Sequence, residues 1–194
     1  MADYVEVTDA EIDPESPVTT SLLSRLRDNA IAMITGSLGA PRVKPVILHI
    51  QYVVDSGTNG GAAAATTWNT RSLNTVVTNE ITGASLASNK ITLPAGTYDI
   101  DAMAFYRSTE MNQLAVYNET DAAFLFYGMN YYGQAAVSFS NVATIRRRFT
   151  LAATKEISIK HYTQGATDTS GLGLPVSIAG VSEIYVDVKI TQVG

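Results

Sequence analysis

From Arg42 onward, apolar and polar residues alternate along most of the chain. The segments LHIQYVV (48–54) and IYVDVKI (184–190) show this alternation most clearly. Because successive side chains of a β-strand point to opposite faces of a sheet, the pattern indicates half-buried strands. Turn residues recur about every ten residues, and no helical segments separate the strands. The sequence therefore predicts roughly eight to ten antiparallel strands in an all-β sandwich or jelly roll.

One helical pattern precedes the strands, in PVTTSLLSRLRDNAIAMITGSLGAPR (17–42). Its apolar stripe consists of Leu23, Leu26, Ala30 and Met33, which are spaced to share one helix face. A cap is expected within residues 16–20, and the glycines and proline at 36, 39 and 41 should end the helix. Because the stripe is too short to hold a coiled coil alone, we expect it to dock between subunits or onto a larger particle. The alternative is packing against the sandwich of its own subunit.

The sequence thus predicts two parts. Residues 1–42 form an N-terminal attachment segment, in which an acidic, extended lead of sixteen residues precedes the helix. Residues 43–194 form the jelly-roll domain. A loop rich in glycine and alanine at 55–65 is expected to be flexible and is a secondary candidate for receptor contact.

Composition excludes several functional classes. Only 16% of residues are charged, against about 25% in ordinary soluble domains, which favours burial of part of the surface in an oligomer. The net charge of -5 argues against nucleic-acid binding. Absence of cysteine removes disulfides, thiol chemistry and Cys-type zinc sites. With no apolar leader and no run of ~18 apolar residues, we expect no secretory signal and no membrane insertion.

Asp99 and Asp101 are predicted to point the same way along one strand, about 6.5–7 Å apart. Paired carboxylates at such spacing can hydrolyse glycosides or bind calcium. They can equally pair with Arg146 or Arg148 on a neighbouring strand. We favour the ion pairs and therefore expect no catalytic residues, no metal and no cofactor.

Two further groups of polar residues have ordinary structural interpretations. His49 and His161 both lie in predicted strands, and no nucleophile-elbow motif accompanies them. We therefore expect structural histidines. The run Arg146–Arg148 alternates between two strand faces, so it forms no continuous basic patch for nucleic acid.

The densest aromatic stretch is FLFYGMNYYG (124–133). Tyrosine rings stack on sugar faces or pack at protein interfaces, and amides bond to hydroxyl groups. The receptor-binding candidates are Tyr127, Asn130, Tyr131 and Tyr132. In the alternative interpretation, Phe124 and Phe126 fill the sandwich while the two adjacent tyrosines at 131–132 pack at a subunit seam.

Two segments resemble known proteins. The helical segment 17–41, with SL at 21–22, RLRDN at 25–29 and GAP at 39–41, resembles the helical lead of many tailed-phage virion proteins. In tail-fibre and baseplate proteins such a lead precedes the C-terminal domain. The stretch from WNTR (68–71) through LNT (73–75) to LPAGTY (93–98) is similar to the opening strands of C1q-like and TNF-like jelly rolls. The resemblance implies a homotrimeric virion structural protein, with a jelly roll packed around a three-fold axis. The sequence departs from a long fibre in one respect, since we expect no shaft.

From these observations we expect a trimeric tail-fibre or tail-tip module, made in the host cytoplasm and located in the virion. Its N-terminal segment would attach to other virion proteins, and its jelly roll would bind a host-surface glycan or protein. One alternative is a capsid-decoration or baseplate component without a receptor role. Others are a glycan-processing enzyme that uses Asp99 and Asp101, or a C1q-like lectin unrelated to phage.

Overall fold

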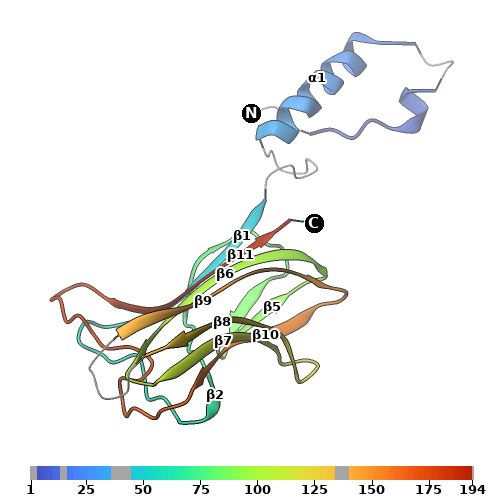
Figure 1. Cartoon of the computed structure of the whole chain (residues 1–194). Coiled ribbons are helices and arrows are strands. Elements are labelled where there is room, and N and C mark those ends of the chain that lie inside the picture. Colours follow the sequence, from blue (N-terminus) through green and yellow to red (C-terminus); the bar gives the residue numbers. More distant parts are fainter. Residues whose placement is uncertain (1–3, 14–16, 36–44, 134–139, 194) are drawn as a thin grey trace. The chain divides into compact units, whose positions relative to one another are not determined.

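The computed structural model describes residues 4–13, 17–35, 45–133 and 140–193. The chain divides into two compact units, Met1–Pro45 and Val46–Gly194 (Figure 1). The predicted domain boundary after residue 42 and the predicted helix-ending residues at 36, 39 and 41 lie outside the described residues. Within the described parts, no helix has the length and hydropathy needed to cross a membrane.

The N-terminal unit contains the short 3-10 helix η1 (Asp9–Glu11) and the helix α1 (Thr20–Thr35). Thr19 caps α1 as predicted, because its hydroxyl accepts the backbone N–H of Leu22 at 3.1 Å. The lead ahead of α1 is not simply extended, since it includes the η1 turn.

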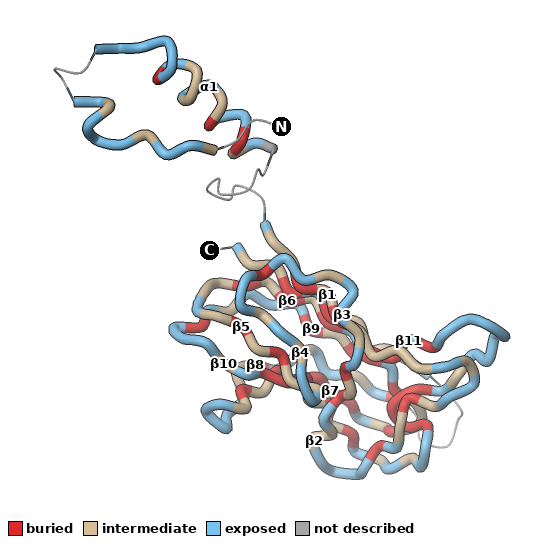
Figure 2. The backbone as a smooth tube through the Cα atoms, turned by 180° about the vertical axis from the view of Figure 1, so that it is seen from behind, coloured by how far each residue is buried: buried red, intermediate tan, exposed pale blue. Residues whose placement is uncertain are grey.

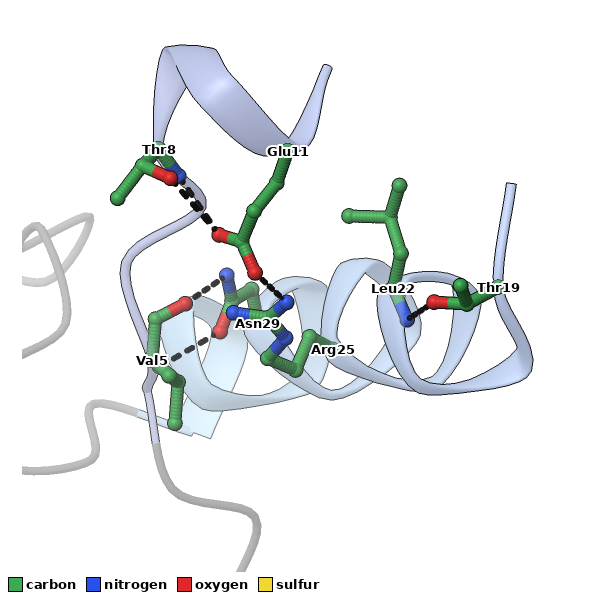
Figure 3. Close-up of polar contacts among 7 residues, drawn as sticks. All are labelled: Val5, Thr8, Glu11, Thr19, Leu22, Arg25 and Asn29. Carbon is green, nitrogen blue, oxygen red and sulfur yellow. Dashed lines mark hydrogen bonds and ion pairs between the residues drawn. The ribbon is translucent and has the colours of Figure 1, made fainter. Parts of the chain in front are cut away.

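Side chains of α1 hold the lead to the helix (Figure 3). The carboxamide of Asn29 donates to the carbonyl of Val5 at 2.7 Å and accepts the N–H of Val5 at 2.9 Å. Arg25 forms an ion pair with Glu11, and this hydrogen-bonded guanidinium lowers the pKa of Glu11 to about 2. The lead and the helix therefore form one small folded unit.

Within the described residues, the second unit contains eleven strands. They are β1 (Val46–Val54), β2 (Thr67–Thr70), β3 (Thr75–Asn79), β4 (Ser85–Ala87), β5 (Lys90–Leu93), β6 (Gly96–Arg107), β7 (Met111–Asn118), β8 (Ala123–Tyr132), β9 (Ser140–Leu151), β10 (Lys155–Thr163) and β11 (Glu183–Gln192). The first sheet has the order β3-β1-β11-β6-β9. The second has the order β4-β5-β10-β7-β8, and β2 pairs with the free half of β10.

The chain alternates between the two layers of a sandwich (Figure 1). From β5 onward it visits the second sheet, the first, the second twice, the first, the second and finally the first. All pairings are antiparallel. This is the connectivity of a jelly roll, as the spacing of the predicted strands indicated.

The core lies between the two sheets, where each contributes one face of alternating residues. On β6 the alternate side chains that face the second sheet are all buried, namely Tyr98, Ile100, Ala102, Ala104 and Tyr106. The alternation is likewise confirmed at Leu48 and Ile50 and at Val186, Val188 and Ile190, whose side chains lie in the core. It fails at Ile184, which is 45% exposed, because the pairing register of β1 and β11 shifts between Val186 and Ile184. Figure 2 shows this buried layer along β1, β6 and β9.

At one end of the sandwich, Arg71 is a fully buried cation. Its guanidinium donates to the carbonyls of Phe105 at 3.1 Å, Leu172 at 2.8 Å and Tyr185 at 3.2 Å. Burial lowers its pKa to about 9. Because these carbonyls belong to β6, β11 and the loop before β11, one side chain fastens that loop to the first sheet.

Two features of this region depend on the fold. The residues after 66 form two short strands in different sheets, β2 in the second and β3 in the first. The loop at 55–65 is fastened, with Ala63 buried and bridged to Thr167, and with the Gly60 N–H bonded to the Gly173 carbonyl. Neither contact is visible from local sequence, because each partner lies about a hundred residues away along the chain.

Gly128 sets how closely β8 approaches β9. A Cβ at this position would lie 2.5 Å from the carbonyl oxygen of Thr144 and 2.8 Å from Cγ1 of Ile145.

We predict that Gly128→Ala lowers the free energy of unfolding by about 1–3 kcal/mol through overpacking. Urea unfolding followed by the fluorescence of Trp68, the single tryptophan, measures this. Gly165→Ala is the control, since its Cβ would meet Thr109 only at an ordinary 3.4 Å. Equal stability of the two variants would contradict the prediction.

Candidate functional site

The outward face of the second sheet carries a cluster of aromatic rings, here called the ring platform. It consists of Trp68 on β2, Tyr117 on β7, Phe124 and Tyr127 on β8, and Tyr162 on β10. The Trp68 ring lies 4.9 Å from Phe124, 5.7 Å from Tyr127 and 5.5 Å from Tyr162, measured between centroids. These separations are those of favourable aromatic pairs.

Strand register explains why these distant residues meet. Trp68 pairs directly with Tyr162 across β2 and β10, and Tyr117 pairs with Phe124 across β7 and β8. On β10 the alternate side chains of Ile159 and His161 are buried in the core. Tyr162 therefore points outward.

A pocket of about 430 Å³ adjoins the platform. It is lined by Met111, Asn112, Gln113, Asn130, Tyr131, Tyr132 and Tyr162. Tyr162 belongs to both the platform and the pocket, so the two form one continuous surface. Gln113 donates to the carbonyl of Gly128 at 3.0 Å, which orients its carboxamide at the pocket wall.

This surface has the chemistry of a binding site for sugars or for a protein. Tyr127 and Tyr132 are 49% and 70% exposed, far more than core rings, and Asn130 is exposed beside them. Exposed ring faces stack on apolar faces of a ligand, while the amides and phenol hydroxyls bond to its polar groups.

The four receptor candidates from the sequence all lie on or beside this surface. Tyr127 belongs to the platform, whereas Asn130, Tyr131 and Tyr132 line the pocket. Tyr131 is half-buried, with its hydroxyl 2.6 Å from that of Thr144 and its ring packed toward Tyr106, so it supports the pocket more than it contacts solvent.

Sequence reasoning missed most of the platform. The alternative interpretation placed both Phe124 and Phe126 in the sandwich. Phe126 fills the core, but Phe124 lies on the platform. Trp68, Tyr117 and Tyr162 were not singled out. The alternation on β10 was sufficient to place Tyr162 outward, but the position of Trp68 depends on a pairing that only the fold reveals.

The acidic pair on β6 is engaged by arginines, as the sequence interpretation favoured. Arg148 binds Asp99 through two hydrogen bonds of 2.8 and 2.7 Å, and this lowers the pKa of the Asp99 carboxyl. Arg146 pairs with Asp101 at 3.1 Å. A carboxylate held ionised in this way is a poor general acid, which weighs against glycoside hydrolysis. Within the described ranges, no three His, Asp or Glu side chains gather in a way that could hold a metal ion.

The two histidines have structural surroundings. Nε2 of His49 lies 3.1 Å from both carboxylate oxygens of Asp187 on the neighbouring strand. His161 is completely buried, with its ring 5.9 Å from that of Tyr106 in an edge-on arrangement. Burial, and secondarily the nearby charge of Arg71, holds the pKa of His161 well below its usual value.

The apolar stripe of α1 remains largely exposed within its own unit. Leu23 and Leu26 are 56% and 49% exposed, Ala30 is exposed and Met33 is half-buried. The lead covers a different side of the helix, where Leu22, Asn29 and Ala32 are buried. The stripe is therefore available for contact with another surface.

The sequence matches no protein-family model and no curated protein. Its structure is similar to Eiger TNF from S. frugiperda, with a TM-score of 0.52 and 11% identity over 78% of this chain and 94% of that one. It is also similar to murine APRIL at pH 5.0, with a TM-score of 0.50 and 10% identity over 77% of this chain and all of that one. The fold is a TNF-like jelly roll. At these identities the likeness concerns the fold alone, and the predicted fold class is confirmed.

His161 should make stability depend on pH. The unfolded chain binds a proton at this residue below pH about 6.5, whereas the folded protein keeps it neutral down to its depressed pKa. The free energy of unfolding should therefore fall as the pH is lowered from 7 to 5, by up to about 1.4 kcal/mol per pH unit. Urea unfolding at several pH values measures this slope. It should largely disappear in His161→Leu and persist in His49→Gln, whereas a slope unaltered in His161→Leu would refute the assignment.

Proposed function

We propose that this protein is a trimeric structural protein of a tailed-phage virion that presents its jelly roll to a receptor on the host surface. The N-terminal unit attaches it to other virion proteins, and the ring platform with its adjoining pocket contacts a surface glycan or protein. The observation that carries the adhesive role is this exposed surface of clustered rings and amides on one sheet face.

Self-association is supported by the outward face of the first sheet. Met103 and Phe105 on β6 are each 39% exposed there, and Val142 on β9 pairs with Phe105. Ile184, near the start of β11, is 45% exposed. These four residues are called the apolar end of the first sheet. Large apolar side chains that are grouped and exposed on one face of a sheet are typical of a surface that a partner covers.

Attachment is supported by α1 and by the likeness of its sequence to the helical leads of phage tail-fibre and baseplate proteins. Its exposed stripe offers leucine and methionine side chains at helical spacing to a neighbouring surface. A two-heptad stripe binds weakly alone, but three copies on one trimer bind together with a gain from effective concentration.

Other assignments fit the surface less well. Assignment as a capsid-decoration or baseplate component without a receptor role does not account for the ring platform. A glycan-processing enzyme needs a free acid, and Asp99 and Asp101 are held by Arg148 and Arg146. A C1q-like lectin accounts for the jelly roll and the platform but gives no reason for the phage-like helical lead.

The adhesive role predicts that the fluorescent protein coats the cells of a susceptible strain within a bacterial panel and blocks infection. Tyr132→Ala and Asn130→Ala should each weaken cell binding roughly tenfold, because each removes a contact worth about 1.4 kcal/mol. Met129→Ala is the matched control, since this residue is 64% exposed and lies close by on β8 but does not line the pocket. If saturating wild-type protein neither coats cells nor blocks infection, the receptor role fails and only a structural role remains.

The trimer predicts a mass of three chains by light scattering that persists on dilution. Phe105→Asp should shift the protein to folded monomers, because it places a charge in the buried centre of the contact. Tyr132→Asp, which charges an exposed ring on the other sheet, should leave the trimer intact. A well-folded wild-type monomer at all concentrations would rule out the trimer.

A further inference from the structure

The segment between β10 and β11 ends in an uncharged loop with exposed aliphatic side chains. This aliphatic loop, residues 174–182, reads LPVSIAGVS and contains neither a charged nor an aromatic residue. Val176 is 73% exposed and Ile178 is 54% exposed, with Leu174 and Val181 also exposed. In Figure 1 the loop projects in orange-red from the jelly roll, at the end of β11 away from the C-terminus, and Figure 2 shows it as a pale blue tip.

Hydrogen bonds from neighbouring residues hold the backbone of the aliphatic loop. The buried carboxylate of Glu183 accepts the backbone N–H groups of Val176 at 3.0 Å, Ser177 at 2.8 Å and Gly57 at 3.1 Å. These bonds lower the pKa of Glu183, so it remains ionised at neutral pH. The hydroxyl of Ser56 bonds to the carbonyl of Ile178 at 2.7 Å. The backbone is thus held by polar groups while the apolar side chains face solvent.

The loop is continuous with the apolar end of the first sheet. Ile184 follows Glu183 directly and belongs to that surface. Val186, two residues further on, pairs with Ala104 on β6, which places Ile184 near the Phe105 end of β6. At the base of the loop, Arg71 fastens Leu172 and Tyr185 to Phe105. Loop and sheet therefore form one apolar surface with a rigid base.

The composition of the loop distinguishes between two kinds of partner. Sites that recognise a separately folded target depend on Trp, Tyr and Arg, as on the ring platform. Permanent contacts between copies of one chain are more apolar and resemble the interior of a domain. Aliphatic side chains without any charged group fit the second kind, and they would promote aggregation if a monomer left them in water.

We propose that the aliphatic loop is a clasp between subunits, which extends the contact made by the apolar end of the first sheet onto a second copy of this chain. The proposal rests on the trimer proposed above and assigns the loop to assembly, not to the receptor. Glu183 is then a positioning residue, because it acts through the backbone of the loop and makes no contact with the partner.

Dilution of the full chain tests the clasp. We expect the double variant Val176→Asp and Ile178→Asp to dissociate at a protein concentration at least tenfold higher than wild type, as measured by light scattering. Val77→Asp is the matched control, because this exposed valine lies on the edge strand β3 outside the loop, and it should dissociate as wild type does. Glu183→Gln, which leaves the aliphatic side chains in place, should give a smaller shift in the same direction. Circular dichroism of each variant checks that the jelly roll is folded.

A chemical measurement gives an independent result. Since the chain has no cysteine, Ile178→Cys introduces a unique thiol. A maleimide should modify it at least tenfold more slowly in the assembled protein than after dilution below the dissociation concentration. Val77→Cys should react at the same rate in both states.

The outcomes separate this inference from the proposed function. A monomeric wild type would overturn both the trimer and the clasp. A trimeric wild type with a loop variant that dissociates no more readily than Val77→Asp would overturn the clasp alone. A loop variant that stays trimeric but no longer coats host cells would also overturn it, and would assign the loop to the receptor.

Discussion

Burial of two alternating faces between the sheets is the constraint on which the rest of the molecule depends. Tyr98, Ile100 and Tyr106 occupy the inner face of β6, and Ile157, Ile159 and His161 occupy that of β10. Because successive side chains of a strand point to opposite faces of the sheet, the sequence neighbours of these residues point outward. The outward rows that carry Asp99, Phe105 and Tyr162 are therefore fixed by the same packing that stabilises the fold.

The two outward faces differ in chemistry, and this difference suggests a division of labour. The second sheet presents clustered rings and amides, which suit a ligand that is bound and released. The first sheet presents paired charges at one end, such as Asp99 with Arg148, and bare apolar side chains at the other, such as Phe105. That arrangement suits a contact made once, at assembly, in which the apolar area supplies the affinity.

The sequence was sufficient for features that depend on local periodicity. Alternation identified buried side chains of β1 and β11, such as Leu48 and Val188, and helical spacing identified the stripe on α1. It was not sufficient where two distant strands must pair in a defined register. Trp68 meets Tyr162 only because β2 joins the half of β10 that β5 leaves open. Glu183 likewise reads as an ordinary strand residue until the fold brings Gly57 and Val176 to its carboxylate.

Asn29 contacts Val5 only through the backbone N–H and carbonyl, while the Val5 side chain remains 46% exposed. Every amino acid except proline offers the same two backbone groups. The helix therefore recognises the path of the lead at this point and not its chemical identity. Position 5 is consequently suited to carry a fluorophore or an unnatural side chain that reports on docking, because the contact that holds the lead in place would be unchanged.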